Sequence, residues 1–430
     1  MGKQKRPKLA KKYIVRNVVI LLLSAVFLVA GAGCLYVDGL LKNIGFTGHI
    51  TPIVSQDINA GTVDSGTQYT TDGANQVNGL LKDEAITNIL LIGVDDYDPN
   101  DPIGRSDSMM LISVDNRHKK LKMTSYMRDT YVAIPGHTSQ KLNAAYHFGA
   151  YYAVEDDGAK PGDMQSVDAG AQLCMRTLEL HFGMDIDRYV VVKDSAFNQV
   201  IDAFGGVDLQ ITAKEARQID LSVGEDVSNL ESTQTADVTT QHLNGVQAHY
   251  FSRIRQEGTQ NGVDITIPNV NGHYGDMGRA ERQRMVVQAV VDKFKSSDLG
   301  TISSVAKQVL PKVITNMNTD EVTSLLLQSM SILEYPTQSN QVPAENDYTA
   351  EVVYIGQQKA DILEVNDLAQ TREKALQFIY EDDRPQTTGD ITQKMEALGQ
   401  TEKPSGAGQD ADPSADTGEG AGTDAGGTGW

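Results

Sequence analysis

Short apolar runs alternate along this chain with longer amphipathic runs, and this alternation constrains the fold more than any other feature. Runs that predict strands lie at 85–95, 108–115, 120–127, 188–194, 207–212, 249–255 and 350–356. Runs that predict helices lie at 169–183, 195–206, 279–297 and 300–335, with one further helix near 74–82. Strands that alternate with helices indicate layered α/β architecture, so we expect a layered α/β/α domain with a central mixed sheet, preceded by one transmembrane helix.

The N-terminal region places a basic segment directly before an uncharged apolar one. Residues 1–16 hold seven Lys or Arg and no acid, and residues 18–37 form a run of 20 residues without a charge. That length matches a helix that spans a bilayer, and the basic flank predicts a cytoplasmic N-terminus with the rest of the chain outside the cell. A signal peptide cleaved after the Ala-Gly-Ala at 30–32 and a lipoprotein cysteine at Cys34 are the alternatives. The apolar run continues past residue 32, which favours the uncleaved anchor.

Composition divides the remainder of the chain and excludes several functions. The expected organisation is a cytoplasmic basic head (1–16), a transmembrane anchor (17–37), an extracytoplasmic spacer (38–85), a catalytic domain (86–385) and a disordered acidic tail rich in Gly, Ala and Asp (386–430). The formal net charge of −20 makes direct nucleic-acid binding improbable. The sequence contains no phosphate-binding loop of the G-x-x-x-x-G-K-[ST] type, no G-x-S-x-G motif and no H-E-x-x-H motif.

The acidic residues of GVDDYD and GRSDS form the first candidate site. Asp95 follows the strand predicted at 85–95, and Asp107 precedes the next one. Ends of neighbouring strands can bring two carboxylates together, and such a hard oxygen site suits Mg²⁺. The alternative is that these acids only cap or turn a loop.

Arginines form the second group of candidates. Arg128 and Asp129 end the strand predicted at 120–127. Arg253 and Arg255 are two residues apart, so on a strand both would point to one face. A solvated strand face is the alternative, although mixed charges are more usual there.

The segment GDMGRAERQR at 275–284 places more arginines at the start of a predicted helix. Arg279, Arg282 and Gln283 share one helical face, whereas Arg284 is rotated away toward the surface. Arginine in a first helical turn opposes the helix dipole, so a bound anion would explain it. Together, the arginines and the metal site predict a pyrophosphate site.

Seven motifs carry a resemblance to a known family. They are NILLIGVDDYD, GRSDSMMLISVD, SYMRDTYVAIPG, KLNAAYHFG, DAFGGVDL, HLNGVQAHYFSRIR and GDMGRAERQR. Their order is that seen in LytR–CpsA–Psr proteins, which this chain resembles over about residues 86–300.

The resemblance implies a membrane-bound, extracytoplasmic, Mg²⁺-dependent phosphotransferase. Such an enzyme moves a glycopolymer (teichoic acid, capsule or similar) from a polyprenyl-pyrophosphate carrier to the 6-hydroxyl of muramic acid in peptidoglycan. Carried over by motif, Asp95 and Asp107 would bind Mg²⁺, and Asp276 would act as the base, with Arg279 and Arg128 also catalytic. The residues that would bind the pyrophosphate are Arg105, Arg128, Arg253, Arg255, Arg279, Gln283 and Lys141. The apolar helices would line a groove for the polyprenyl tail.

The sequence departs from the family pattern at two places. Met127 stands where the family usually has Pro, and the segment 256–274 is longer than in the family, which indicates a lid or specificity loop. The alternative functions are a polyprenyl-pyrophosphate phosphatase that uses water as acceptor, and a non-catalytic envelope regulator or lipid-carrier binding protein.

Overall fold

A computed structural model of the chain describes residues 45–46, 80–95, 103–223, 238–309, 312–318, 334–355 and 358–383, with residues 321 and 332. The predicted head, anchor and acidic tail, with nearly all of the spacer, lie outside these residues. In the part of the chain that the structure describes, no helix combines the length and apolar character needed to cross a bilayer.

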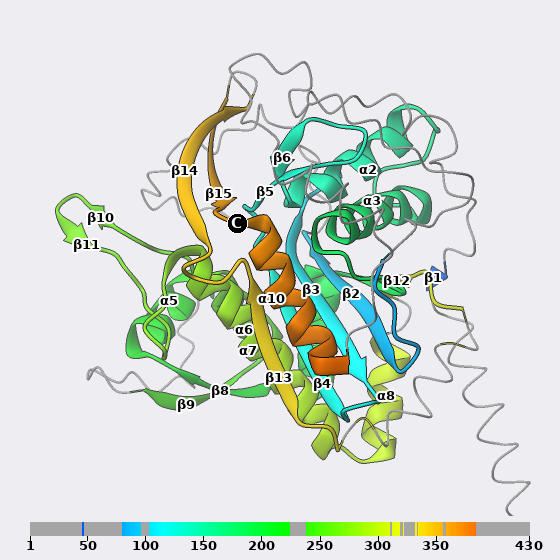
Figure 1. Cartoon of the computed structure of the whole chain (residues 1–430). Coiled ribbons are helices and arrows are strands. Elements are labelled where there is room, and N and C mark those ends of the chain that lie inside the picture. Colours follow the sequence, from blue (N-terminus) through cyan, green and yellow to red (C-terminus); the bar gives the residue numbers. More distant parts are fainter. Residues whose placement is uncertain are drawn as a thin grey trace, which may run out of the picture.

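A seven-stranded mixed sheet forms the centre of the described chain (Figure 1). Its order is β1 (Gly45–Phe46), β12 (Val313–Thr315), β7 (Arg188–Lys193), β2 (Ile86–Val94), β3 (Ser106–Asp115), β4 (Lys120–Tyr126) and β13 (Thr337–Val342). Strand β2 is parallel to β7 and antiparallel to β3, and β13 is parallel to β4. The prediction of a central mixed sheet is therefore confirmed.

One face of the sheet is covered by α2 (Asn143–Glu155), α3 (Met164–Phe182) and α10 (Leu368–Tyr380). Burial alternates along β2, which places Leu90 and Ile92 in the core under these helices. Helix α3 begins at Asp163, whose side chain accepts a hydrogen bond from the Ser166 amide, and ends at Gly183 in the left-handed conformation. The predicted ending at Gly183 is confirmed.

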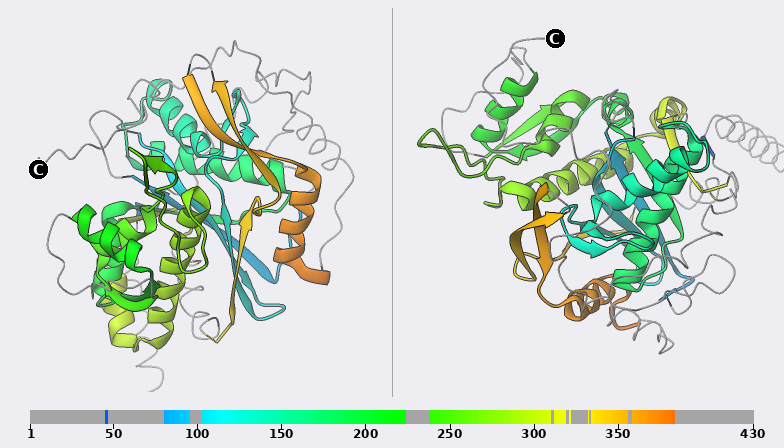
Figure 2. Two further views of the ribbon diagram at one scale, coloured as in Figure 1. Left: turned by 90° about the vertical axis from the view of Figure 1, so that its left-hand side faces the viewer. Right: turned by 90° about the horizontal axis from the view of Figure 1, so that it is seen from above.

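The other side of the sheet carries α4 (Asp194–Ala203), α5 (Ala213–Val223), α6 (Gly245–Arg253), α7 (Gly275–Ser296) and α8 (Leu299–Val309). The hairpin of β8 (Val207–Ile211) and β9 (Thr239–Leu243) packs with them around a second core that contains Ile201, Phe251 and Val286. The left view of Figure 2 shows α10 and this group of helices on opposite sides of the sheet. Helices therefore cover both faces, and α7 runs along β4 and β13.

The strand predicted at 249–255 is wrong, because this segment is the end of helix α6. Asn244 and Gln247 form a capping box that starts the helix, and each side chain bonds the other residue's backbone amide. Ala248, Phe251 and Ser252 are buried at helical spacing. The polar and apolar residues of HYFSRIR resemble the alternation of a strand. The capping box that starts the helix lies upstream of this segment, at Asn244 and Gln247.

Two helix predictions need smaller corrections. Within the predicted helix at 300–335, α8 ends at Val309 and strand β12 follows. At the other end of the domain, Leu81 forms a parallel bridge with Met184 where the helix near 74–82 was expected. Residues 74–79 of that prediction lie outside the described residues.

Three short hairpins complete the described fold. They are β5 (Tyr131–Ala133) with β6 (Ser139–Lys141), β10 (Thr259–Gln260) with β11 (Val263–Asp264), and β14 (Tyr348–Ile355) with β15 (Gln358–Val365). The strand predicted at 350–356 is confirmed as part of β14.

Segments late in the chain hold the turn after β4. The Met127 amide donates to the Val342 carbonyl of β13 (2.9 Å), and the Leu363 amide of β15 donates to the Asp129 carbonyl (2.8 Å). The backbone on both sides of Arg128 is thereby fixed from two later strands.

A buried lysine ties α10 to the far end of the sheet. The Lys122 ammonium lies 2.7 Å from Asp115 Oδ2 and 2.7 Å from the Ile379 carbonyl oxygen, and both charged side chains are fully buried. Glu381, in the short 3₁₀ helix η3 (Glu381–Asp383), accepts from Lys120 and lies 2.9 Å from Lys122. Each buried charge thus has a partner of opposite sign.

A second buried ion pair fixes α7. Arg282 Nε donates to Glu215 Oε1 of α5 (2.6 Å), and the two other guanidinium nitrogens donate to the Ile254 and Ile267 carbonyls (2.9 and 2.7 Å). Both side chains are completely buried. Arg282 therefore holds α7 against α5 and the chain that follows α6.

We expect Arg282→Ala to lower the free energy of unfolding by about 3–5 kcal/mol, because it leaves the Glu215 carboxylate buried without a partner. Urea denaturation followed by circular dichroism measures this. Arg284→Ala, two residues along the same helix, should cost much less, because the side chain of Arg284 donates to the neutral Gln341 (3.2 Å) and forms no buried ion pair with the described residues. Equal losses for the two variants would contradict the structural role given to the Arg282–Glu215 pair.

Candidate active site

Carboxylates from the ends of neighbouring strands meet around one arginine. Asp95 follows β2, Asp107 lies at the start of β3, and Arg253 ends α6. Arg253 Nη1 lies 2.8 Å from Asp95 Oδ1, and Nη2 lies 3.5 Å from Asp107 Oδ2. The structure therefore brings the two predicted metal ligands to one guanidinium.

A second arginine continues this set of ion pairs. Arg128 Nη1 donates to Asp107 Oδ1 (2.8 Å), and its Nε lies 3.4 Å from Asp129 Oδ2. Lys141, the last residue of β6, places its ammonium 2.9 Å from Asp129 Oδ1. A continuous series of alternating charges thus runs from Lys141 through Asp129, Arg128 and Asp107 to Arg253.

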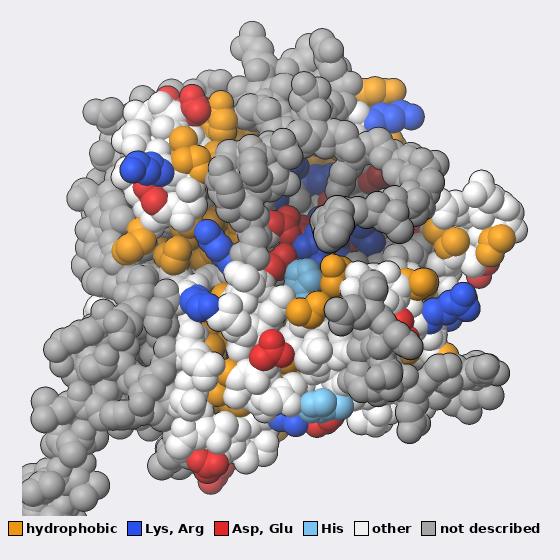
Figure 3. All heavy atoms as spheres, turned by 180° about the vertical axis from the view of Figure 1, so that it is seen from behind, with side chains coloured by type: hydrophobic (Ala, Val, Ile, Leu, Met, Phe, Trp, Pro, Cys, Tyr) orange, Lys and Arg blue, Asp and Glu red, His pale blue; other side chains and the backbone are white. Residues whose placement is uncertain are grey.

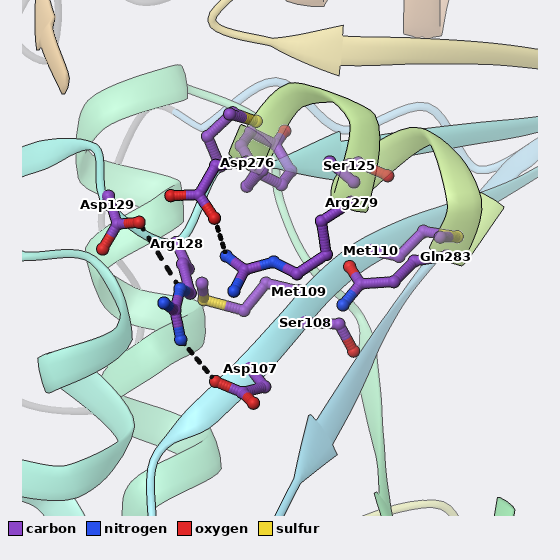
Figure 4. Close-up of a pocket in the computed structure, with 13 residues that line it drawn as sticks. Asp107, Ser108, Met109, Met110, Ser125, Arg128, Asp129, Asp276, Arg279 and Gln283 are labelled. Carbon is purple, nitrogen blue, oxygen red and sulfur yellow. Dashed lines mark hydrogen bonds and ion pairs between the residues drawn. The ribbon is translucent and has the colours of Figure 1, made fainter. Parts of the chain in front are cut away.

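Helix α7 adds a third arginine above this series. Figure 4 shows Asp276 and Arg279 facing Arg128 and Asp107 across a small cavity, with Gln283 one helical turn further along. Arg279 Nη2 lies 2.7 Å from Asp276 Oδ1. The cavity has a volume of about 10 Å³, which is room for about one water molecule. Ser125 also lines it, and its hydroxyl is buried without a hydrogen-bond partner among the described residues.

Helix α7 begins at Gly275, four residues earlier than predicted, so its first turn contains Asp276 and not Arg279. Asp276 occupies the first turn, where a negative charge is favourable, and Arg279 lies beyond it. The expected conflict between arginine and helix dipole is therefore absent at this helix start. Arg279 is nevertheless buried, and its charge is balanced by Asp276.

The surrounding guanidinium groups keep Asp107 ionised. Burial opposes the charged form, but Arg128, Arg253 and Arg279 outweigh it and hold the pKa of the Asp107 carboxyl below its ordinary value. Asp95 behaves oppositely, because burial and the nearby charge of Asp107 raise its pKa more than Arg253 lowers it. The positive charges therefore compensate Asp107, whereas Asp95 is repelled by the charge of Asp107.

Asp276 and Asp129 form a second pair with opposite shifts. Burial, followed by a hydrogen bond with Asp129, raises the pKa of Asp276 to about 6. Burial also opposes ionisation of Asp129, yet the hydrogen bond from Asp276 and the charges of Arg128 and Lys141 lower its pKa. Asp129 therefore stays charged while Asp276 exchanges a proton near neutral pH, which is the behaviour required of a general base.

Three predicted arginines, Arg105, Arg253 and Arg255, lie outside the cavity lining, as do Asp95 and Lys141. Arg105 is half-buried just before β3, and Arg255 is exposed two residues after Arg253. The expectation that Arg253 and Arg255 point to one face of a strand is wrong, because Arg253 ends a helix.

Arg282, expected on the anion-binding face, points to Glu215 instead. Arg284, expected at the surface, is half-buried and donates to Gln341 of β13.

Two acids of the site were assigned no role from the sequence. Asp129 follows Arg128 directly, and Asp194 follows strand β7 as Asp95 follows β2. The signal for Asp194 was its place at the end of the strand predicted at 188–194, but the sequence did not show that this strand lies next to the strand before Asp95. For Asp129, the burial and the contact with Lys141 depend on the β5–β6 hairpin.

A larger groove lies along α7 and is partly polar. Its volume is about 710 Å³, and its apolar lining residues include Met123, Leu209 and Met285. Asp208 and Asp292 also line it, so in the described residues it lacks the uniformly apolar lining expected for a polyprenyl tail. On the face opposite to Figure 1, acidic and basic side chains gather in a recess near the middle (Figure 3).

Comparison with known proteins identifies relatives of the whole region. A model of the LytR_cpsA_psr family matches residues 54–371. The polyisoprenyl-teichoic acid–peptidoglycan teichoic acid transferase TagU of Oceanobacillus iheyensis is 34% identical over 251 residues, which are 58% of this chain and 63% of that protein. TagV of Bacillus subtilis, of the same description, is 28% identical over 237 residues, which are 54% of this chain and 50% of that protein. The chain thus spans about half to two thirds of the length of these two relatives.

Among solved structures, one described as TagT bound to LI-WTA is similar to this chain. The TM-score is 0.47 at 20% sequence identity, and the match covers 74% of this chain and 92% of the other.

The raised pKa of Asp276 predicts a pH-dependent contribution to stability. The folded protein retains this proton up to pH about 6, whereas an unfolded Asp loses it near pH about 4. The contribution is therefore complete below pH about 4 and is lost as the pH rises through about 6. We expect the free energy of unfolding to fall more from pH 5 to pH 7 in the unmodified protein than in Asp276→Asn, measured by urea denaturation. Parallel pH dependences of the two proteins would contradict the assigned pKa.

Proposed function

Because the chain belongs to the LytR–CpsA–Psr family, we propose that it is a membrane-anchored phosphotransferase. It moves a glycopolymer from a polyprenyl-pyrophosphate carrier to the 6-hydroxyl of muramic acid in peptidoglycan. The similarity to TagU and TagV, which are described as teichoic acid transferases, supports the substrate class. The uncharged run at 18–37 supports an anchor in the cell membrane, with the catalytic domain outside the cell.

The observation that carries this proposal is a set of three arginines, of which Arg128 and Arg279 line the cavity and Arg253 lies against Asp107 at its edge. Arg128, Arg253 and Arg279 come from a turn, a helix end and a helix, and each lies against at least one carboxylate. Guanidinium groups bind phosphate oxygens in fixed, often bidentate geometry. A pyrophosphate brings enough negative charge to replace the carboxylates as partner of these arginines.

The carboxylates near Arg253 fit a magnesium ion. Asp95 and Asp107 offer hard oxygen ligands, and a positively charged group already lies between them. Bound there, Mg²⁺ would neutralise charge on the pyrophosphate oxygens. Lys141 and Asp129 lie at the other end of the charge series, so Lys141 is placed to contact the head group rather than the metal.

Asp276 is placed to receive the proton of the attacking hydroxyl. The hydroxyl oxygen forms a bond to the sugar-side phosphorus as its proton passes to Asp276, and the bond from that phosphorus to the bridging oxygen breaks. Polyprenyl phosphate leaves with the electron pair. Arg128 and Arg279 stabilise the negative charge that grows on the phosphate oxygens, without a covalent intermediate on the protein. The charge of Asp129 beside Asp276 raises the proton affinity of the base.

We expect Asp107→Asn and Arg279→Ala to reduce transfer by about 100-fold or more, because each removes a charge that the transition state requires. The full-length protein in detergent would be incubated with Mg²⁺, a short-chain polyprenyl-pyrophosphate glycan and a peptidoglycan oligomer. Mass spectrometry then measures the phosphodiester-linked product. Arg284→Ala, on the same helix but bonded to β13, should retain most of the activity.

The same reaction separates the alternatives. Release of glycan phosphate with no linked product, in the presence of acceptor, would instead indicate a phosphatase. Saturable binding of the carrier without turnover would contradict an enzymatic function. Full transfer by Asp107→Asn would contradict the assignment of Asp107 to the active site, but it would still support the proposed transferase function.

A further inference from the structure

Three carboxylates, and not two, surround the guanidinium of Arg253. In addition to Asp95 and Asp107, Asp194 places its Oδ2 3.2 Å from Arg253 Nη1. Asp194 is the first residue of α4 and has no part in the function proposed above. Its carboxylate also faces His249 of α6, whose Nδ1 lies 3.6 Å from Asp194 Oδ1.

The strand register explains why the three acids converge. On the parallel strands β2 and β7, Val94 pairs with Lys193, so the residues that follow them are Asp95 and Asp194. On the antiparallel strand β3, Gly93 pairs with Ser108 and Val94 with Ser106, so Asp107 is the extra residue of a β-bulge beside Val94. Neighbouring strands lie about 4.8 Å apart, and β2 is the middle strand of the three. The backbone of the sheet therefore fixes the three carboxylates at adjacent positions of one edge.

The charges at this edge do not balance through Arg253 alone. Among the described residues, all three carboxylates lie against the guanidinium of Arg253, and Arg128, which also lies against Asp107, is shared with Asp129. A divalent cation in the place of the guanidinium would neutralise the group more fully. Magnesium binds oxygen at about 2.0–2.1 Å, so it cannot lie among these oxygens while the guanidinium remains between them.

We propose that Asp95, Asp107 and Asp194 form one cation site, and that Arg253 occupies it whenever the metal is absent. The metal displaces the guanidinium, which then turns to the pyrophosphate of the substrate. This inference rests on the function proposed above, from which it takes the metal and the two ligands Asp95 and Asp107. It adds the third carboxylate and makes metal binding and substrate binding depend on one movable side chain.

Arg253 is placed to make this movement. It ends helix α6, and its side chain is 44% exposed even with its three partners in place. The group of Asp115, His118 and Glu381 at the far end of the sheet offers an instructive contrast. There the cation is Lys122, which is completely buried and also bonds the Ile379 carbonyl, so it cannot leave without exposing buried charge. A buried lysine is a permanent partner, whereas an exposed arginine at a helix end can be exchanged.

The test measures Mn²⁺ binding to the full-length protein in detergent, without substrate, by isothermal titration calorimetry and by the electron paramagnetic resonance signal of free Mn²⁺. We expect Asp194→Asn to weaken Mn²⁺ binding about tenfold or more, because it removes a ligand charge. We expect Arg253→Gln to strengthen it about tenfold, because the competing cation is gone. Arg217→Gln removes the same charge from an exposed position of α5 and should change affinity less than about twofold.

The outcomes separate this inference from the proposed function. If Asp107→Asn weakens Mn²⁺ binding but Asp194→Asn does not, Asp194 is not a metal ligand and the site consists of Asp95 and Asp107 alone. If Arg253→Gln leaves the affinity unchanged or lowers it, Arg253 does not occupy the cation site. If Asp107→Asn also leaves the affinity unchanged, the metal assignment of the proposed function itself is wrong.

A measurement on the unmodified protein covers the case in which a variant fails to fold. Mg²⁺ titration of protein carrying ¹⁵N-labelled arginine should move one side-chain Nε–H resonance, the one that is lost in Arg253→Gln or Arg253→Lys. If calorimetry detects Mg²⁺ binding but the Arg253 Nε–H resonance does not move up to saturating Mg²⁺, the exchange of metal for guanidinium is overturned.

Discussion

Carboxylates at the ends of adjacent strands repel one another unless cations lie between them, and the rest of this site follows from that requirement. The register of β2 with β3 and β7 fixes Asp95, Asp107 and Asp194 at one edge of the sheet. The positive charges must therefore come from outside the sheet. Arg128 comes from the turn after β4, and Arg253 comes from the end of α6. Each of these elements is in turn held by contacts that lie away from the charges.

Each of the three arginines of the site already lies against a carboxylate of the protein, which has a consequence for what can bind. An incoming anion must compete with Asp107, Asp129 and Asp276 for the same three arginines. A singly charged ligand gains little from such an exchange, whereas a pyrophosphate can replace several carboxylates at once. The internal ion pairs thus favour multiply charged ligands while keeping the arginines oriented before a ligand binds.

Local sequence patterns predicted the elements whose burial is periodic and whose boundaries carry caps. Strand β2 and helix α3 are examples, since the first alternates strictly and the second ends at Gly183. The pattern failed at α6, where a seven-residue alternation outweighed the Asn244–Gln247 capping box just upstream. The two candidate ligands Asp95 and Asp107 were predicted because they flank recognisable strands.

Other features of the site depend on contacts that no local pattern encodes. Arg279 and Arg282 are equivalent by helical spacing, yet Arg279 faces Asp276 and Arg282 faces Glu215 on α5. The partner of Arg282 lies 67 positions earlier in the chain, so only the packing of α5 against α6 and α7 decides between the two roles. Similarly, Asp194 joins the site only because β7 lies next to β2.

The hydrogen bonds from β13 and β15 to the turn around Arg128 link the site to the order in which the chain emerges. Met127 and Asp129 are bonded to residues 342 and 363, more than 200 positions downstream. Contacts of such sequence separation form late in folding, because a long loop must close first. A chain that is still being synthesised therefore carries most of its sheet before this turn is fixed. The arginine that contacts Asp107 acquires its support only when nearly the whole domain is present, so an incomplete chain would not hold a formed anion site.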